Sequence, residues 1–284
     1  MTPFRRRNRL DRTRISRGRN RSDSEDQSDD SVDFEVEEVE LVKPRVRSKG
    51  IYLLPNAFTT AALFCGFFAI VQAMNHQFET AAIAIFASLV LDGMDGRIAR
   101  MTNTQSAFGE QYDSLADMVS FGVAPALVAY EWVLKDFGKW GWLAAFTYCA
   151  GAALRLARFN INTGVVDKKF FQGLPSPAAG ALIAGFIWLA ADNKLPVRDS
   201  AIPWVTFFIT IYAGLTMVSN ARFYSGKALD VRYRVPFGVM VLMILTFVLI
   251  SSNPPLTLFG VFVVYSISGY VIWAWEHLSG KRFS

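Results

Sequence analysis

Four aspartates form the group of side chains best suited to chemistry: Asp92, Asp95, Asp113 and Asp117. The first two end one apolar stretch, three residues apart, and the second two begin the next stretch, four residues apart. Both spacings put a pair of side chains on one face of a helix. If the two stretches form antiparallel helices, four carboxylates meet at one end of the pair. They would repel strongly unless cations lay between them, and oxygen ligands favour Mg²⁺, Mn²⁺ or Ca²⁺.

Small and basic residues accompany these acids. Gly96, Ala99 and Gly109 leave room for a flat ligand to approach the backbone. Arg97 and Arg100 can contact phosphate oxygens in pairs. Taken singly, small residues in membrane helices are often packing devices, and buried acids can be proton relays. The set as a whole favours a metal and pyrophosphate site over either alternative.

The rest of the chain is rich in apolar segments, with 52% of its residues hydrophobic and 24 Phe and 7 Trp. Eight stretches approach the length of about 20 residues that a helix needs to cross a bilayer. They cover approximately 56–75, 80–100, 107–134, 140–162, 175–191, 200–220, 235–252 and 256–276. The sequence therefore predicts an all-α integral membrane protein with about eight transmembrane helices.

The charges between these stretches predict an orientation. The connections after the second, fourth and sixth stretches are richer in Lys and Arg than those after the odd-numbered ones. Positively charged loops stay in the cytoplasm. Both termini and the four aspartates are therefore expected on the cytoplasmic side of a multi-pass protein.

The first 55 residues differ from the rest. Residues 1–42 hold an arginine block followed by an acidic, serine-containing block, and this composition predicts a disordered cytoplasmic tail. A solvated tail is favoured over one that binds nucleic acid or anionic lipid, and it is given no catalytic role. The basic residues of 43–55 predict an interfacial juxtamembrane segment, and 56–278 would form the transmembrane catalytic domain.

The two cysteines and two histidines of the chain are too few to indicate a disulfide framework or a zinc site. Cys65 and Cys149 lie in apolar stretches, which predicts buried thiols and no disulfide framework. His76 and His277 have no metal-ligand spacing, so zinc chemistry is not expected.

The run DGMDGRIAR at 92–100, with Gly109, Asp113 and Asp117 at their spacings, is similar to the signature of the CDP-alcohol phosphatidyltransferase family, DxxDGxxARx8GxxxDxxxD. Every fixed position matches. The softer segments SFGVAP at 120–125, RLARFN at 155–160, GLPSPAA at 173–179 and SNAR at 219–222 resemble the membrane-embedded type of phosphatidylserine synthase, an enzyme of bacterial inner or cell membranes.

The resemblance implies two metal ions, Mg²⁺ or Mn²⁺, as cofactors. Asp92 and Asp113 would be shared by both ions, Asp95 would serve one, and Asp117 would serve the other while acting as general base. It also implies contacts with CDP-diacylglycerol from seven residues: Asn56, Thr59, Gly96, Ala99, Arg100, Ser106 and Gly109. For Ser106, a helix N-cap is an equally good interpretation.

The acceptor implied by the softer segments is L-serine. Arg155 and Arg158 share a helical face and could bind its carboxylate, with Ser176 in a loop closing over it. Arg222 and Lys227 are alternatives, and for all four cations simple anchoring at the cytoplasmic face is the competing interpretation. The lipid bilayer and a second copy in a homodimer are the other partners implied; nucleic acid is not.

The expected reaction is direct displacement, in which the serine hydroxyl attacks the lipid-linked phosphorus and CMP leaves, and a route through a phosphatidyl-enzyme intermediate stays open as the alternative mechanism. No HxK pattern is present, which disfavours the phospholipase-D-like type of serine synthase. Two alternatives stay open. The same transfer could use glycerol 3-phosphate, inositol phosphate or choline, and a protein of another class, a cation-coupled transporter, would use the acids as a relay.

Overall fold

The computed structural model describes residues 53–102, 106–162, 170–193, 195, 201–224 and 237–279. The prediction for residues 1–42 lies outside this part of the chain, as does that for Lys227, and of the predicted juxtamembrane segment 43–55 only 53–55 are described, as the start of α1. The elements are α1 Leu53–Met74, α2 Phe78–Met101, α3 Ala107–Asp117, η1 Met118–Val123, α4 Ala124–Trp132, η2 Leu134–Phe137, α5 Lys139–Asn162, β1 Phe170–Gln172, α6 Ser176–Asp192, α7 Ile202–Val218, β2 Arg222–Tyr224, α8 Phe237–Ser252 and α9 Pro254–Ser279.

Each of the eight predicted stretches contains a helix, so the helical fold class is confirmed. The third stretch differs from a plain helix. It runs through α3, the π-helical turn η1 and α4, with helical backbone at both junctions. Among the described residues, α1 and α9 contain apolar segments long enough to cross a membrane, Pro55–Met74 and Pro254–Trp275. The helices α6, α7 and α8 are apolar but shorter.

Local sequence signals explain several helix boundaries. Ser106 has extended backbone, and its hydroxyl accepts a hydrogen bond of 3.0 Å from the Gly109 amide, which is an N-cap for α3. Prolines occupy the first turn of α4, α6 and α7, where no intrahelical partner for a backbone N–H is lost. The N-cap at Ser106 thus fixes where α3, the helix that carries Asp113 and Asp117, begins.

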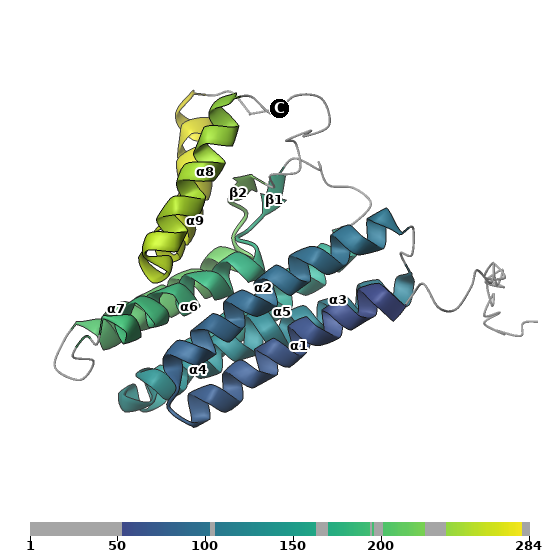
Figure 1. The fold of residues 1–284 in the computed structure, drawn as a ribbon. Helices are drawn as coiled ribbons and strands as arrows, with labels where there is room; N and C mark the ends of the chain where they lie inside the picture. The colour runs from purple at the N-terminus through teal and green to yellow at the C-terminus, as the bar shows by residue number, and fades with distance from the viewer. Residues whose placement is uncertain are drawn as a thin grey trace, which may run out of the picture. The chain divides into compact units, whose positions relative to one another are not determined.

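The helices α1 and α2 pack side by side along their lengths (Figure 1). At their centre the Ala62 carbonyl accepts two hydrogen bonds, from Ser88 of α2 at 2.8 Å and from Ser120 of η1 at 3.2 Å. Gly66 lies against the same turn, and a Cβ there would come within 2.7 Å of the Ser120 Cα. Hydrogen bonds to α1 therefore hold α2 and η1 side by side close to the four aspartates.

Glycine also allows close crossings elsewhere. A Cβ on Gly151 of α5 would lie 2.5 Å from the Gly214 carbonyl oxygen of α7. A Cβ on Gly185 of α6 would lie 3.1 Å from the Phe259 Cα of α9. Close backbone approach at small residues is the usual packing mode of helices in membranes.

A short antiparallel ribbon joins two connections that are distant in sequence. Phe170 pairs with Tyr224 and Gln172 with Arg222. Beside it, Gly173 has a φ of +77° and its amide donates to the Ala221 carbonyl at 2.9 Å. The strand β2 also packs against α9 (Figure 1). The sequence did not predict this ribbon.

Candidate functional site

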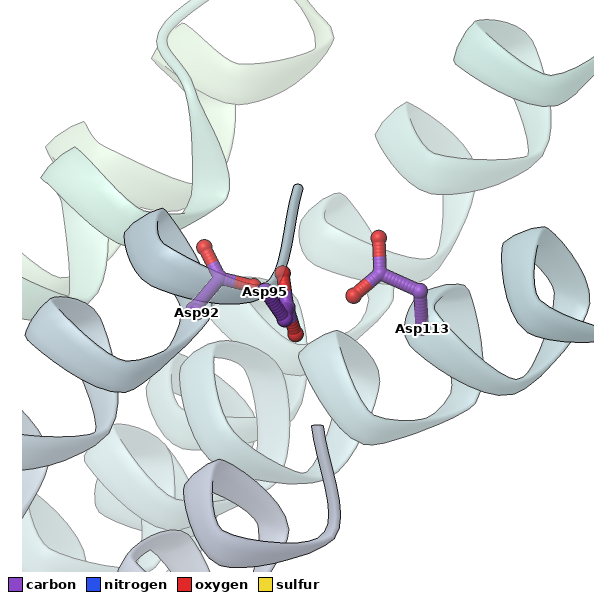
Figure 2. Close-up of side chains that lie close together, drawn as sticks. All are labelled: Asp92, Asp95 and Asp113. Carbon is purple, nitrogen blue, oxygen red and sulfur yellow. The ribbon is translucent and has the colours of Figure 1, made fainter. Parts of the chain in front are cut away.

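The acids of α2 and α3 meet as their spacing predicts. One carboxylate oxygen from each of Asp92, Asp95 and Asp113 lies within 4.8 Å of the others. Figure 2 shows the two α2 side chains and the facing Asp113 of α3 directed toward one another. Asp113 Oδ1 is buried and has no hydrogen-bond partner among the described residues. A buried, unpaired carboxylate oxygen beside two further carboxylates fits a site for a hard divalent cation.

Asp117 lies one turn beyond Asp113, at the junction of α3 and η1. It lies within hydrogen-bonding reach of Asp92 and within range of charge interactions with Asp113 and Arg155, and among the described residues it forms no ion pair with Arg155. The fourth aspartate therefore lies on the side of the cluster that faces α5. The π-helical turn begins at the next residue, and such turns are frequent at functional sites because they redirect the following side chains.

Thr59 supports the cluster from α1. Its hydroxyl donates a hydrogen bond of 2.8 Å to Asp95 Oδ2, and both residues are buried. The Pro55 carbonyl is a second acceptor at 3.2 Å. Hydrogen bonds to metal-ligating side chains fix their orientation. The sequence resemblance implied a lipid contact for Thr59 and missed this role, although the same segment, PNAFT at 55–59, had drawn attention to it.

The residues predicted to contact the nucleotide lie on the last turns of α2 and the first turns of α1 and α3. Gly96 is exposed, and a Cβ there would meet no protein atom within 4 Å among the described residues. Packing therefore does not explain this glycine. Asn56 lies close to Gly109, where an added Cβ would lie 3.5 Å from the Asn56 Oδ1. Ala99 is half-buried and Arg100 exposed on the same last turns of α2.

The structure gives Ser106 the N-cap role described above. Its hydroxyl serves the Gly109 amide. A contact between Ser106 and phosphate stays a prediction.

Two of the residues predicted to bind the acceptor, Arg155 and Ser176, come together from α5 and α6. Arg155 Nη1 donates to Ser176 Oγ at 2.8 Å. The Arg155 Nε is buried and has no hydrogen-bond partner among the described residues. Since Arg155 also interacts with Asp117, it links the predicted serine-binding residues with the predicted base.

The other cations are placed differently. Arg158 Nη1 contacts Asn220 Oδ1 at 3.3 Å, near the end of α5 and away from Ser176 in the hydrogen-bond network. Arg222 belongs to strand β2. The structure thus places Arg155 in a hydrogen bond with Ser176 and within range of a charge interaction with Asp117, whereas Arg158 pairs with the loop that precedes β2.

Sequence reasoning also missed two tyrosines near Arg155. Tyr148 of α5 is fully buried, and its hydroxyl donates to the Phe121 carbonyl of η1 at 2.7 Å. Tyr265 of α9 lies within electrostatic reach of Arg155, and its hydroxyl donates to the Tyr224 carbonyl at 3.2 Å. No local pattern signals either contact, because both partners lie on other elements.

Comparison with known proteins identifies the same family as the aspartate motif does. The family model described as CDP-alcohol phosphatidyltransferase matches residues 52–212. A protein of Helicobacter pylori named CDP-diacylglycerol–serine O-phosphatidyltransferase is 39% identical over 218 residues, which are 76% of this chain and 90% of the relative. Relatives of the same name in Mycobacterium leprae and Bacillus subtilis are 36% identical over 188 residues and 39% identical over 127 residues. These cover 63% and 45% of this chain, and 60% and 71% of the relatives.

The matched segment contains the four aspartates, Thr59, Arg155 and Ser176. It ends before β2, α8 and α9. With the acid cluster assembled as the spacing predicts and the family match covering more than half of the sequence, the chain belongs to the CDP-alcohol phosphatidyltransferase family.

Proposed function

We propose that this chain transfers the phosphatidyl group of CDP-diacylglycerol to the hydroxyl of L-serine, which forms phosphatidylserine and releases CMP. The observation that carries the proposal is the cluster of carboxylates from Asp92, Asp95 and Asp113, one of which has a buried oxygen without a hydrogen-bond partner among the described residues. The relatives with the name CDP-diacylglycerol–serine O-phosphatidyltransferase support serine as the acceptor.

Two divalent ions, Mg²⁺ or Mn²⁺, are the proposed cofactors. Asp92, Asp95 and Asp113 would hold them, with Asp117 as a further ligand, and the unpaired Asp113 Oδ1 supports this assignment. Bound ions would stabilise the negative charge that develops on the phosphoryl oxygens and on the departing CMP.

The residues of the chain have separate proposed roles. Asp117 takes the proton from the serine hydroxyl, and its charge interaction with Arg155 supports a position on the acceptor side of the cluster. Arg155 binds the serine carboxylate through its free Nε and is oriented by Ser176. The open space at Gly96 admits the cytidine diphosphate end of the lipid.

The proposed setting is a membrane. The chain would cross it about eight times, with the active site and both termini in the cytoplasm and a second copy as its partner. Large apolar side chains exposed on α1 and α9 support contact with lipid, for example Phe64, Phe67, Val264 and Trp273.

The test is an acceptor panel. Purified protein in detergent, Mn²⁺ or Mg²⁺ and CDP-diacylglycerol are incubated with L-serine, glycerol 3-phosphate, inositol phosphate or choline in turn. CMP release and the lipid product are measured. We expect turnover with serine and phosphatidylserine as the product. Turnover with glycerol 3-phosphate and none with serine would refute the proposed acceptor.

A second experiment tests the proposed base by replacing it. Asp117→Asn should lower kcat at least about a hundredfold, because a positioned base contributes factors of this size. CDP-diacylglycerol should still bind to the folded variant. Turnover equal to that of the unmodified chain would show that Asp117 is not the base.

A further inference from the structure

The π-helical turn η1 joins two helices with different tasks. The helix before it, α3, carries Asp113 and Asp117, whereas six of the nine residues of α4 after it are buried in the core. The Ala124 N–H donates to the Val119 carbonyl, five residues back instead of the four of an α-helix. Because an α-helix turns by about 100° per residue, this wider turn sets how the acids of α3 are rotated relative to α4.

The sequence leaves one carbonyl of the turn without its usual donor. In an α-helix the Phe121 carbonyl would accept from the N–H of residue 125, and that residue is a proline, which has none. The Tyr148 hydroxyl of α5 donates to this carbonyl at 2.7 Å, and both partners are buried. A buried carbonyl that lacks a donor is costly, so the hydroxyl stabilises the turn.

The surroundings of the turn give solvent little room to replace this hydroxyl. Ser120, Phe121 and Gly122 are all buried. From α6, a Cβ on Gly180 would lie 3.2 Å from the Pro125 Cγ and 3.4 Å from the Phe121 ring. The turn therefore depends on the hydrogen bonds that other helices supply to it.

We infer that Tyr148 is a positioning residue whose hydroxyl holds η1 in its π-helical form and thereby directs the acids of α3 toward those of α2. π-Helical backbone is rare, so the turn needs contacts that favour it over an α-helix. In the α-helical form α3 would rotate by about 100°, and a neighbouring residue would face α2 in place of Asp113. The inference rests on the proposed function for the catalytic role of the acids, whereas the rotation itself can be tested without turnover.

The first experiment uses Tyr148→Phe, which removes the hydroxyl and keeps the ring. The variant and the unmodified chain are compared by thermal unfolding in detergent, by Mn²⁺ titration with electron paramagnetic resonance, and by CMP release at saturating Mn²⁺. We expect a lower melting temperature, and Mn²⁺ affinity and kcat each lower by about tenfold, since misplaced ligands and bases lose factors of this size or more. The KM for serine should not change, because Arg155 lies on α5 and not on α3.

A second substitution separates positioning from stability. Pro125→Ala, added to Tyr148→Phe, returns an N–H that can donate to the Phe121 carbonyl in an α-helical turn. The melting temperature should then rise above that of the single variant, whereas Mn²⁺ affinity and kcat should stay low because α3 keeps the wrong rotation. Recovery of all three quantities would show that the hydroxyl only stabilises the fold. A melting temperature that does not rise would contradict the role given to Pro125.

Tyr212→Phe is the matched control. Tyr212 of α7 also donates its hydroxyl to a backbone carbonyl of another helix, that of Ser266 in α9, at 2.9 Å. This variant should lower the melting temperature and leave Mn²⁺ affinity and kcat unchanged. Mn²⁺ affinity and kcat in Tyr148→Phe equal to those of the unmodified chain would overturn the inference. If the unmodified chain binds Mn²⁺ but releases no CMP with serine, the proposed function fails, while the Mn²⁺ affinities of the variants still test the positioning.

Discussion

At the scale of single residues, the hydroxyl of Thr59 decides how one carboxylate of the acid cluster is held. Its bond to Asp95 joins side chains 36 positions apart in the sequence and is buried at both ends. The aspartates themselves could be predicted, because their spacing is local to two helices. The threonine contact could not, since it depends on how α1 packs against α2.

Replacing this hydroxyl should weaken metal binding. Thr59→Val keeps the shape of the side chain and leaves Asp95 Oδ2 without its donor. Loss of such an outer contact typically costs 10–100-fold in metal affinity, and we expect about tenfold. Electron paramagnetic resonance of Mn²⁺ during a titration measures it. Thr60→Val, which removes a hydroxyl bonded to Tyr112 at 2.9 Å, is the control. Equal affinity in Thr59→Val and the unmodified chain would contradict the prediction.

A substitution at Gly96 can distinguish a role in ligand binding from a role in helix packing. Because a Cβ at this position meets no protein atom within 4 Å, Gly96→Leu should leave the melting temperature unchanged. The bulky side chain should raise the KM for CDP-diacylglycerol about tenfold or more, since it fills the proposed nucleotide space. Gly260→Leu, at an equally open position on α9, should change neither quantity. A lower melting temperature with normal KM would identify Gly96 as a packing residue.

At the scale of elements, the π-helical turn η1 connects the proposed base to the core. Ser120 bonds to the Ala62 carbonyl, and the Phe121 carbonyl receives the Tyr148 hydroxyl. Apolar length and charge predicted the helices well, whereas neither predicted this turn nor the pairing of β1 with β2. The ribbon joins residues about 50 positions apart, and hydrophobic periodicity carries no information on such pairings.

The crossing of α1 and η1 should be sensitive to one methyl group. Gly66→Ala would put a Cβ 2.6 Å from Ser120 Oγ and 2.7 Å from its Cα, so the two backbones must separate. We expect a loss of about 1–3 kcal/mol in unfolding free energy, the usual cost of overpacking, together with reduced kcat. Thermal unfolding in detergent measures the loss. Gly260→Ala should leave the free energy of unfolding unchanged. The same result for Gly66→Ala would contradict the prediction, because it would show that α1 and η1 can move apart without loss of stability.

At the scale of the whole molecule, helices and connections alternate along the chain as the sequence predicts. Length and hydropathy identify two spans among the described residues, α1 and α9. The remaining predicted spans rest on the length of their apolar stretches, whereas the distribution of Lys and Arg predicts their orientation. The orientation of the chain is therefore a separate prediction, and it can be tested without measuring activity.

Labelling of single cysteines reports the orientation. In a background with Cys65→Ala and Cys149→Ala, Asn75→Cys lies in the connection from α1 to α2, and Thr102→Cys follows α2 near the acids. Both positions are exposed. A membrane-impermeant maleimide should label the first variant in intact cells and the second only after the membrane is opened. The reverse pattern would contradict a cytoplasmic active site.

The crowded carboxylates of α2 and α3 also have a thermodynamic consequence. Their mutual repulsion opposes the packing of the two helices, and a bound cation removes it. An ion that binds only the folded chain adds a stabilisation of RT ln(1 + [L]/Kd), about 2.7 kcal/mol at a hundredfold excess over Kd. The ion supply of the cell would then set how much of the protein stays folded, as well as how fast it turns over.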